Sequence, residues 1–314
     1  MQTVFLDQQT FSANISLTNI AEQVSELICY ETTTEDLVIE RCKSADIIIT
    51  NKVILSKEML KQLPQLKLIC IAATGMNNVD LNAAEALGIL VNNVSGYSQA
   101  SVSQYVFAQM LEYFSNTSHH NENTRQGHWQ NSPTFCFHGK GSHELAGKKI
   151  GIIGYGNLGK SVATIAQAFG MQVLIAERPY ATKIRENRDS FTHVLQHADV
   201  ISLHCPQTPE TENLINRETL ALMKTSALLI NTARGGIVNS NDLLHALKNK
   251  IISHAILDVL EQEPPSANHP LISALTNNKI SNLSLTAHIA WASIESQQRL
   301  IDLVASNIQN FMNN

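Results

Sequence analysis

Four side chains in the last third of the sequence have the types and positions needed to oxidise or reduce a small polar molecule. Arg234 follows the apolar run 227–231, Asp258 ends the run 255–258, Glu263 follows five residues later, and His288 comes after the run 283–286. Reduction of a ketone builds negative charge on its oxygen. An acid must therefore supply a proton, and a fixed cation must hold the substrate.

Each of these groups could instead belong to a structural ion pair, and with 12 histidines in the chain a single histidine means little. Their shared position is what favours a site, because ligands of open α/β sheets bind beyond the carboxyl ends of the strands. Gly235 and Gly236 follow Arg234 directly, which indicates a close approach of backbone at this point.

A glycine pattern, Gly154-Tyr-Gly156-Asn-Leu-Gly159, follows the apolar run 149–153 and precedes a helical pattern. In this setting the first glycine permits a tight turn, the second lets backbone approach a pyrophosphate, and the third lets helix and strand pack closely. The helix N-terminus then offers free N–H groups to the phosphates. The alternative is a glycine turn that binds nothing.

An acid, Glu177, lies 18 residues after Gly159, at the end of the next apolar run. A carboxylate there can accept hydrogen bonds from the adenosine ribose hydroxyls and would repel a 2′-phosphate, so NAD is favoured over NADP. Arg178 beside it could soften this preference. An exposed glutamate without a ligand is the simpler alternative.

The elements that must position these residues alternate between strands and helices, which predicts βαβ units and parallel sheets in two α/β domains. Residues 119–147 are rich in His, Asn, Gly, Ser and Pro and are expected to be irregular. Asn239 and Ser240 are candidate N-caps. Strands are expected at 4–6, 47–49, 68–71, 89–91, 149–153, 172–176, 199–203, 227–231, 255–258 and 283–286, and helices at 18–27, 56–63, 99–114, 158–169, 241–248 and 293–311.

Composition limits the alternatives. A chain of 314 residues, 44% apolar and 16% charged, is expected to form two globular domains. Its net charge of −5 argues against a nucleic-acid or anionic-membrane surface, and no apolar run reaches 18 residues. The first basic residue is Arg41, so no secretory signal is expected. The five scattered cysteines contain no CxxC pair, which predicts buried, reduced thiols in the cytoplasm and no metal site.

Six ordered motifs make the chain resemble the D-isomer-specific 2-hydroxyacid dehydrogenase family over nearly its whole length. Within the family it is most similar to glycerate dehydrogenases, also called hydroxypyruvate reductases. The motifs are ATGMNNVD (73–80), NVSGYS (93–98), the glycine turn 154–159, NTARGG (231–236), LDVLEQEP (257–264) and HIAWAS (288–293).

The resemblance implies a role for each matching residue. Arg234 would hold the substrate carboxylate and carbonyl oxygen, His288 would be the general acid and base, and Glu263 would orient His288 and stabilise its protonated form. The N–H groups of Thr74, Gly75 and Met76 would bind the substrate carboxylate. The cofactor would be lined by Val102, Gly154, Gly156, Asn157, Leu158, Gly159, Glu177, Cys205, Pro206, Thr211, Thr232, Ala233, Arg234, Asp258, His288 and Ala290.

The resemblance also implies an architecture. The NAD-binding Rossmann domain, residues 99–285, would be inserted into a flavodoxin-like substrate domain, residues 1–98 with 286–314. The helix from Gln99 and the loop near Trp129 would form a homodimer contact.

The expected reaction is NAD(H)-dependent interconversion of a short 2-oxo acid and its D-2-hydroxy acid, with hydroxypyruvate or glyoxylate as the oxo acid. Met76 would face the substrate cleft and so leaves the choice of acid open. Lys52 either adds positive charge to this cleft or is a solvated loop residue. A first alternative is another acid, such as 3-phosphoglycerate or D-lactate. A second is a dinucleotide-sensing protein that resembles the corepressors of this fold.

Overall fold

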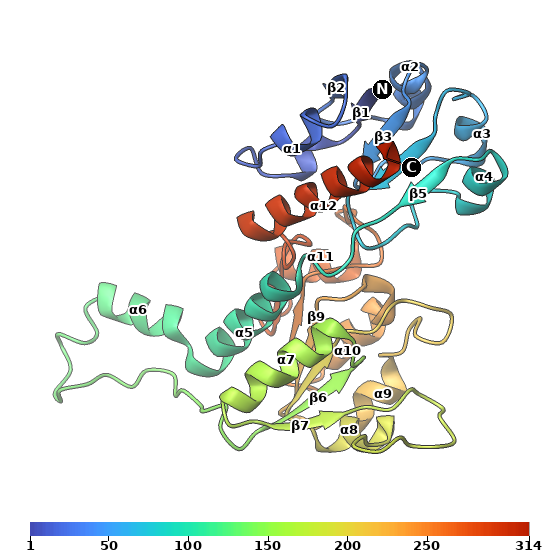
Figure 1. Cartoon of the computed structure of the whole chain (residues 1–314). Coiled ribbons are helices and arrows are strands. Elements are labelled where there is room, and N and C mark those ends of the chain that lie inside the picture. Colours follow the sequence, from blue (N-terminus) through green and yellow to red (C-terminus); the bar gives the residue numbers. More distant parts are fainter. Residues whose placement is uncertain (314) are drawn as a thin grey trace. The chain divides into compact units, whose positions relative to one another are not determined.

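The computed structural model describes residues 1–313, and the chain divides into two compact units. The first comprises Met1–Ser101 and Trp291–Asn314, and the second Val102–Ala290. Both are built on parallel sheets, which confirms the predicted α/β class (Figure 1).

The sheet of the first unit has the strand order β2-β1-β3-β4-β5, with every pair parallel. Alternate residues of each strand point to opposite faces, so Val4 and Ile48 enter one core and Phe5 and Ile49 the other. The strands are β1 (Gln2–Phe5), β2 (Glu26–Cys29), β3 (Ile47–Thr50), β4 (Leu68–Ile71) and β5 (Leu90–Asn92).

Helices cover both faces of this sheet. The core that contains Val4 also takes in side chains of α2 (Val38–Cys42), α3 (Lys57–Leu60) and α4 (Leu81–Ala86). The other core is closed by α1 (Thr18–Ala21) and by α12 (Ile294–Met312), which lies along the sheet although it comes from the far end of the sequence (Figure 1). Ser293 caps α12 by accepting a hydrogen bond from the Ser296 N–H, at 3.2 Å.

The second unit contains a six-stranded parallel sheet in the order β11-β10-β9-β8-β6-β7. β7 and β8 are the neighbours of β6 on its two sides, because the chain forms β7 on one side and then crosses over to form β8 on the other. The glycine turn after β6 therefore lies where the strand order reverses. The strands are β6 (Lys149–Ile153), β7 (Gln172–Ile175), β8 (Val200–Leu203), β9 (Leu228–Asn231), β10 (His254–Leu257) and β11 (Leu283–Leu285).

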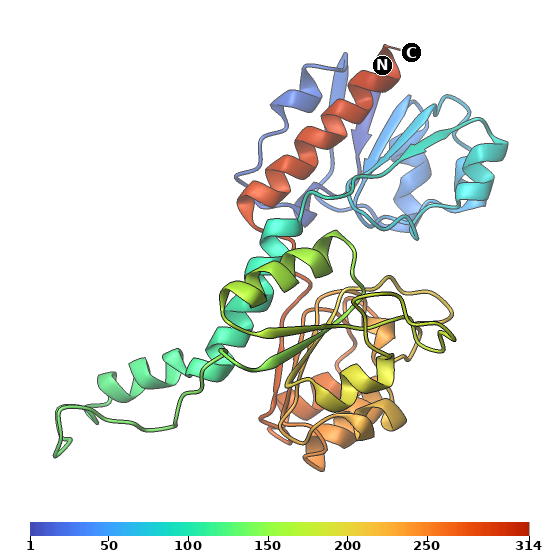
Figure 2. The same ribbon diagram turned by 60° about the horizontal axis from the view of Figure 1, so that its bottom comes forward.

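One face of this sheet contacts α7 (Asn157–Ala168), which packs on β6 and β7. The other carries the main apolar core, to which four further helices contribute (Figure 2). These are α8 (Phe191–His197), α9 (Arg217–Leu222), α10 (Ser240–Lys248) and α11 (Pro270–Thr276). Short 3-10 helices occupy Gln8–Thr10, Glu35–Leu37 and Gly235–Ile237.

A long helix, α5 (Gln99–Ser115), leads into an arm made of α6 (Thr117–Arg125) and the loop that follows it. In both views this arm projects away from the sheet of the second unit (Figures 1 and 2). Three aromatic side chains in the loop are exposed: Trp129 at 56%, Phe135 at 91% and Phe137 at 39%.

Three expectations from the sequence are wrong. The expected helix 18–27 ends at Ala21, and Glu26–Cys29 forms an edge strand because it pairs with β1. The region expected to be irregular contains α6, a helix without a buried residue and so without an apolar pattern to detect. Finally, of the cysteines only Cys42 and Cys70 are buried, whereas Cys29 is exposed.

No helix among residues 1–313 is both long enough and apolar enough to cross a membrane.

The packing of α12 predicts a difference between two of its leucines. Leu300 is fully buried, whereas Leu303 is 38% exposed. Leu300→Ala should lower the free energy of unfolding by about 2–5 kcal/mol, because it removes buried methylenes and leaves a cavity. Leu303→Ala is the matched control and should cost clearly less. Urea unfolding measures both, and equal losses would contradict the packing described here.

Candidate active site

The glycine turn after β6 has the geometry that a dinucleotide pyrophosphate requires. Gly154 has φ of +94°, and a Cβ there would lie 2.4 Å from the backbone N of Cys205. A Cβ on Gly159 would lie 2.1 Å from the Gly154 carbonyl oxygen, whereas one on Gly156 would meet no atom within 4 Å. The open space is thus at the glycine expected to face the phosphates, and α7 begins beside it without a side-chain cap.

Glu177, two residues after β7, is almost completely buried, with only 4% of its surface exposed. Its carboxylate accepts hydrogen bonds from Arg185 Nη2 at 2.5 Å and Nε at 2.7 Å, from the Arg178 N–H at 2.8 Å and from the Arg185 N–H at 3.2 Å. The Arg185 guanidinium and these N–H groups hold the pKa of Glu177 far below its usual range. The residue is therefore ionised but already paired.

The ends of β8 and β9 contribute further residues predicted to line the cofactor. Cys205 is half-buried, and burial raises its thiol pKa to about 11. Thr211 donates a hydrogen bond to the Pro206 carbonyl at 2.7 Å and so ties this loop together. The hydroxyl of Thr232 is buried and, within residues 1–313, has no hydrogen-bond partner. An unpartnered polar atom at a strand end fits a site that takes a polar ligand.

Arg234 stands on a loop fixed by the buried side chain of Asn231. The Asn231 amide accepts a hydrogen bond from the Ala233 N–H at 3.0 Å and donates one to the Arg234 carbonyl at 2.9 Å. The Arg234 side chain is exposed, and its guanidinium donates to the Ala233 carbonyl at 2.7 Å. Within residues 1–313, the other four of its five side-chain N–H groups make no hydrogen bond.

His288 and Glu263 form a short hydrogen bond. His288 Nδ1 donates to Glu263 Oε2 at 2.5 Å, while Glu263 Oε1 accepts from the Leu260 N–H at 2.9 Å. Within residues 1–313, the other ring nitrogen of His288, Nε2, makes no hydrogen bond. The side chain of His288 is 28% exposed and that of Glu263 34%, so a ligand can reach the pair.

The loops that carry Arg234 and Glu263 touch at Gly235. A Cβ on this glycine would lie 1.8 Å from the carbonyl carbon of Leu260, so no other residue fits without moving one of the loops. Because β9, β10 and β11 are neighbours in the sheet, Arg234, Glu263 and His288 all lie beyond the carboxyl ends of adjacent strands.

Asp258, at the end of β10, holds the turn that presents His288. Its buried carboxylate accepts hydrogen bonds from the Thr286 hydroxyl at 2.6 Å and from the N–H groups of Ile289 at 2.9 Å and Ala290 at 2.8 Å. The Asp258 carbonyl also accepts from the His288 N–H at 2.7 Å. His288 itself has φ of +54°, a backbone conformation that is costly for a residue with a side chain and that this network helps to hold.

A second carboxylate–imidazole pair close by was not predicted from the sequence. The buried His269 has Nε2 3.1 Å from Glu261 Oε1, and Glu261 Oε2 accepts a hydrogen bond from the Ser240 hydroxyl at 2.7 Å. Glu261 lies two residues before Glu263, so this pair secures the same loop. The signal in the sequence was the repeated acid in Glu261-Gln-Glu263, which does not identify the partner.

The loop after β4 in the first unit carries the residues that are predicted to bind a carboxylate. Within residues 1–313, the N–H groups of Thr74, Gly75 and Met76 donate no hydrogen bond. Asn93 fixes the loop by donating to the Thr74 carbonyl at 2.7 Å. Sequence reasoning did not identify Asp7, whose buried carboxylate accepts from the N–H groups of Asn51 at 2.9 Å and Lys52 at 2.6 Å and so shapes the loop after β3.

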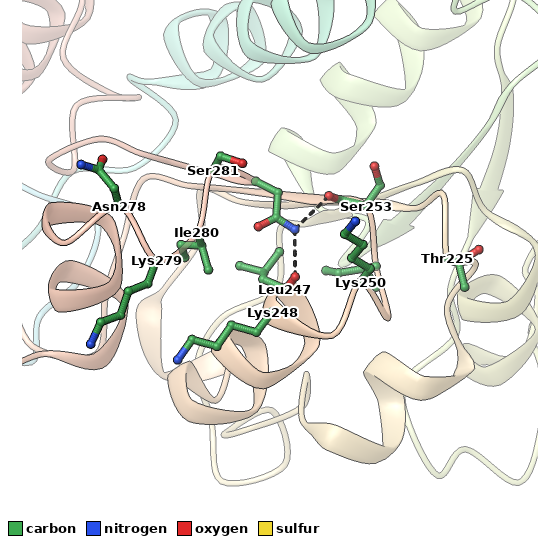
Figure 3. A pocket seen from close by; sticks show the side chains of 11 residues that line it. Thr225, Leu247, Lys248, Lys250, Ser253, Asn278, Lys279, Ile280 and Ser281 are labelled. Atoms are coloured by element: carbon green, nitrogen blue, oxygen red, sulfur yellow. Dashed lines mark hydrogen bonds between the residues drawn. The ribbon is translucent and has the colours of Figure 1, made fainter.

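A cavity of about 440 Å³ opens elsewhere on the second unit (Figure 3). It lies at the amino ends of β10 and β11, the edge opposite to His288, where Asn282 donates to the carbonyls of Leu247 and Ser253. Its lysines, Lys248, Lys250 and Lys279, are exposed and gather near the carboxyl ends of two helices. Cations are favoured there without a ligand, so this cavity does not compete with the strand-end site.

Comparison with known proteins decides the family. The sequence profile of the D-isomer specific 2-hydroxyacid dehydrogenase NAD binding domain matches residues 107–290. This chain belongs to that family. The match confirms the recognition made from the six motifs, and an NAD-binding domain confirms the expected cofactor.

Relatives of this dehydrogenase extend along almost the whole chain. A glycerate dehydrogenase of Methylorubrum extorquens is 40% identical over 99% of this chain and 96% of its own length. A hydroxypyruvate reductase of Blautia hydrogenotrophica is 38% identical over 93% of this chain and 90% of its own. The crystal structure of D-lactate dehydrogenase from Aquifex aeolicus complexed with NAD and lactic acid has a TM-score of 0.81 at 28% identity, and the match covers 99% of this chain and 96% of that one.

The chain is therefore an NAD-dependent D-2-hydroxyacid dehydrogenase similar to the glycerate dehydrogenases. When bound, the nicotinamide ring supplies or accepts the hydride. The residue-by-residue roles expected for the site stay predictions, including those of Val102, Leu158 and Ala290 beside the cofactor.

The network around Asp258 gives a test of the site's construction. Asp258→Asn should lower the free energy of unfolding by about 1–3 kcal/mol, because an amide NH₂ would face a backbone N–H that now has an acceptor. Asp189→Asn is the control: this half-exposed carboxylate lies 3.8 Å from His193 and should change stability by less than about 0.5 kcal/mol. Thermal or urea unfolding measures both, and equal effects would mean that Asp258 does not hold the turn.

Proposed function

We propose that this dehydrogenase reduces a short 2-oxo acid, hydroxypyruvate or glyoxylate, to D-glycerate or glycolate with NADH, using His288 as the general acid. The single observation that carries the proposal is the His288–Glu263 hydrogen bond beside the Arg234 loop. With Nδ1 directed to Glu263, Nε2 is the nitrogen that can meet a substrate oxygen.

The chemistry follows from these positions. As hydride reaches the carbonyl carbon, the oxygen gains a pair of electrons and takes the proton from His288 Nε2. The Glu263 carboxylate stabilises the imidazolium before this transfer and keeps the ring oriented. In the reverse direction neutral Nε2 removes the hydroxyl proton. The histidine is reset by exchange with solvent, which its partial exposure permits.

Arg234 is proposed to hold the substrate carboxylate and carbonyl oxygen. Its planar guanidinium can make two parallel charge-assisted hydrogen bonds, and it lies on a rigid loop. The N–H groups of Thr74, Gly75 and Met76, which belong to the first unit, are proposed to bind a substrate carboxylate. They suit a small planar anion because backbone donors cannot adjust to a bulky group.

The names of relatives support the choice of acid, since they include a glycerate dehydrogenase and a hydroxypyruvate reductase. A phosphorylated or bulkier acid is the alternative. To distinguish these substrates, the loss of NADH absorbance is measured with hydroxypyruvate, glyoxylate, pyruvate and phosphohydroxypyruvate in parallel. A corepressor-like binding protein would turn over every acid far below the usual enzymatic range of about 1–10³ per second.

The role of His288 predicts the effect of its removal. His288→Ala should lower kcat for hydroxypyruvate by roughly 10²–10⁴, the usual contribution of general acid catalysis, while NADH binding measured by nicotinamide fluorescence is retained. The exposed His245 on α10 gives the control, His245→Ala, which should leave kcat unchanged. A kcat within about tenfold of the parent in His288→Ala would remove this residue from proton transfer.

We further propose that two chains pair through the arm formed by residues 116–143, and that the protein works in the cytoplasm. Exposed aromatic side chains that gather on one projecting segment are typical of an interaction surface. Trp129 and Phe135 are joined by a hydrogen bond, from Trp129 Nε1 to the Phe135 carbonyl at 2.9 Å, so the patch is ordered. Five free cysteines support a reducing compartment.

Light scattering on a sizing column tests the pairing. The parent should have the mass of two chains, and the double variant Trp129→Ser/Phe135→Ser should shift toward one, because it removes exposed apolar area from the contact. Tyr180→Ser is the control, since Tyr180 is 93% exposed but lies outside the arm. A monomeric parent, or a double variant that keeps the mass of two chains, would contradict the arm contact.

A further inference from the structure

The carboxylate expected to bind the adenosine ribose has no acceptor site to spare. A carboxylate offers about four lone-pair positions. Glu177 uses four, for the N–H of Arg178 and for the N–H, Nε and Nη2 of Arg185. The ribose hydroxyls could therefore reach Glu177 only by displacing the Arg185 side chain, whose contacts are charge-assisted and so stronger than those of a neutral hydroxyl.

The charge of Glu177 is offset as well. Arg185 lies against it, and the Arg188 guanidinium is 4.0 Å from Oε1. Arg178 follows directly in the chain and is exposed. Residues 177–189 carry four basic side chains against three acidic ones, and the last acid, Asp189, lies 3.8 Å from His193. The repulsion that would exclude a 2′-phosphate is thereby removed.

The arginines also lie at the right place for the adenosine end of a dinucleotide. β7, which leads to Glu177, is the neighbour of β6, which leads to the glycine turn. The Arg188 guanidinium lies over the ring of Tyr155, 5.9 Å from its centre, and Tyr155 is part of that turn. The segment that carries these arginines is thus in contact with the phosphate-binding turn itself.

We propose that Arg185 determines the cofactor preference: by occupying Glu177 it makes this chain accept NADPH as well as NADH. Arg185 uses two of its five side-chain N–H groups on Glu177. The remaining three, together with Arg178, are available to the 2′-phosphate. The proposal deepens the proposed function by specifying the cofactor, and it rests on the glycine turn as the dinucleotide site. It does not depend on His288 or on the identity of the acid.

Direct binding tests this without turnover. NADH and NADPH are titrated into the parent, Arg185→Ala, Arg185→Lys and Lys183→Ala, with nicotinamide fluorescence as the signal. The parent should bind NADPH with a Kd within about 100-fold of that for NADH. Loss of one charge-assisted contact should shift the NADPH-to-NADH ratio of Kd values in Arg185→Ala at least about tenfold toward NADH. Arg185→Lys should keep the charge but lose the paired hydrogen bonds. Its NADPH-to-NADH ratio of Kd values should therefore lie between those of the parent and of Arg185→Ala.

Lys183→Ala is the matched control, because Lys183 is an exposed cation of the same segment that, within residues 1–313, makes no hydrogen bond to Glu177. The ratio of Kd values in this variant should stay close to that of the parent. Displacement of NADH by adenosine 2′,5′-bisphosphate, compared with 5′-AMP, isolates the 2′-phosphate. The advantage of the bisphosphate should be present in the parent and absent in Arg185→Ala.

Three results would overturn the proposal: a parent that binds NADPH more than about 100-fold more weakly than NADH, a ratio shift in Arg185→Ala smaller than about tenfold, or an equal shift in Lys183→Ala. Failure of NADH itself to bind would instead contradict the dinucleotide site. Normal binding without turnover would contradict only the proposed reaction.

Discussion

The contact of Gly235 with the backbone of Leu260 is the constraint on which the rest of the site depends. It lets the loop after β9 and the loop after β10 approach until a Cβ would overlap a carbonyl carbon. The first loop carries Arg234, and the second carries Glu263, whose carboxylate is held by Leu260 and His288. The loops that carry the cation and the acid therefore meet, and the acid holds the imidazole.

The backbone around this contact is stabilised by polar side chains, of which Asn231, Asp258 and His269 are buried and Glu261 is exposed. Asn231 fixes the turn that carries Arg234, and Asp258 fixes the turn that carries His288. The pair of Glu261 and His269 lies on the loop that carries Glu263. Asn231 and Asp258 satisfy backbone N–H groups that the irregular loops would otherwise leave unpaired, and such groups are costly when buried. The polar side chains behind the exposed functional groups therefore hold those groups in the fixed positions that catalysis needs.

Sequence alone predicted most of this because the buried parallel strands are β-branched runs followed directly by polar residues. The strands β4 and β6 and the catalytic candidates could be identified from that pattern. The edge strand β2 could not, because its pairing with β1 is a tertiary event, and α6 could not, because it has no apolar face. Arg185 was missed for a related reason: it lies in an irregular segment, where the path of the backbone and not the spacing decides which carboxylate it meets.

Three carboxylates follow two strands of one sheet, Glu177 after β7 and Asp258 and Glu263 after β10, yet their hydrogen-bond partners and their exposure differ. Asp258 accepts from one hydroxyl and two N–H groups and is 1% exposed, so it supports the turn that presents His288. Glu263 accepts from one N–H and from His288 and is one-third exposed, so it can respond when the imidazole gains or loses a proton. Glu177 accepts four hydrogen bonds, and two of their donors belong to the side chain of Arg185, which is half exposed at the surface. Position after a strand therefore predicts where an acid lies, whereas the contacts and the exposure that decide what it can still bind are set by the tertiary structure.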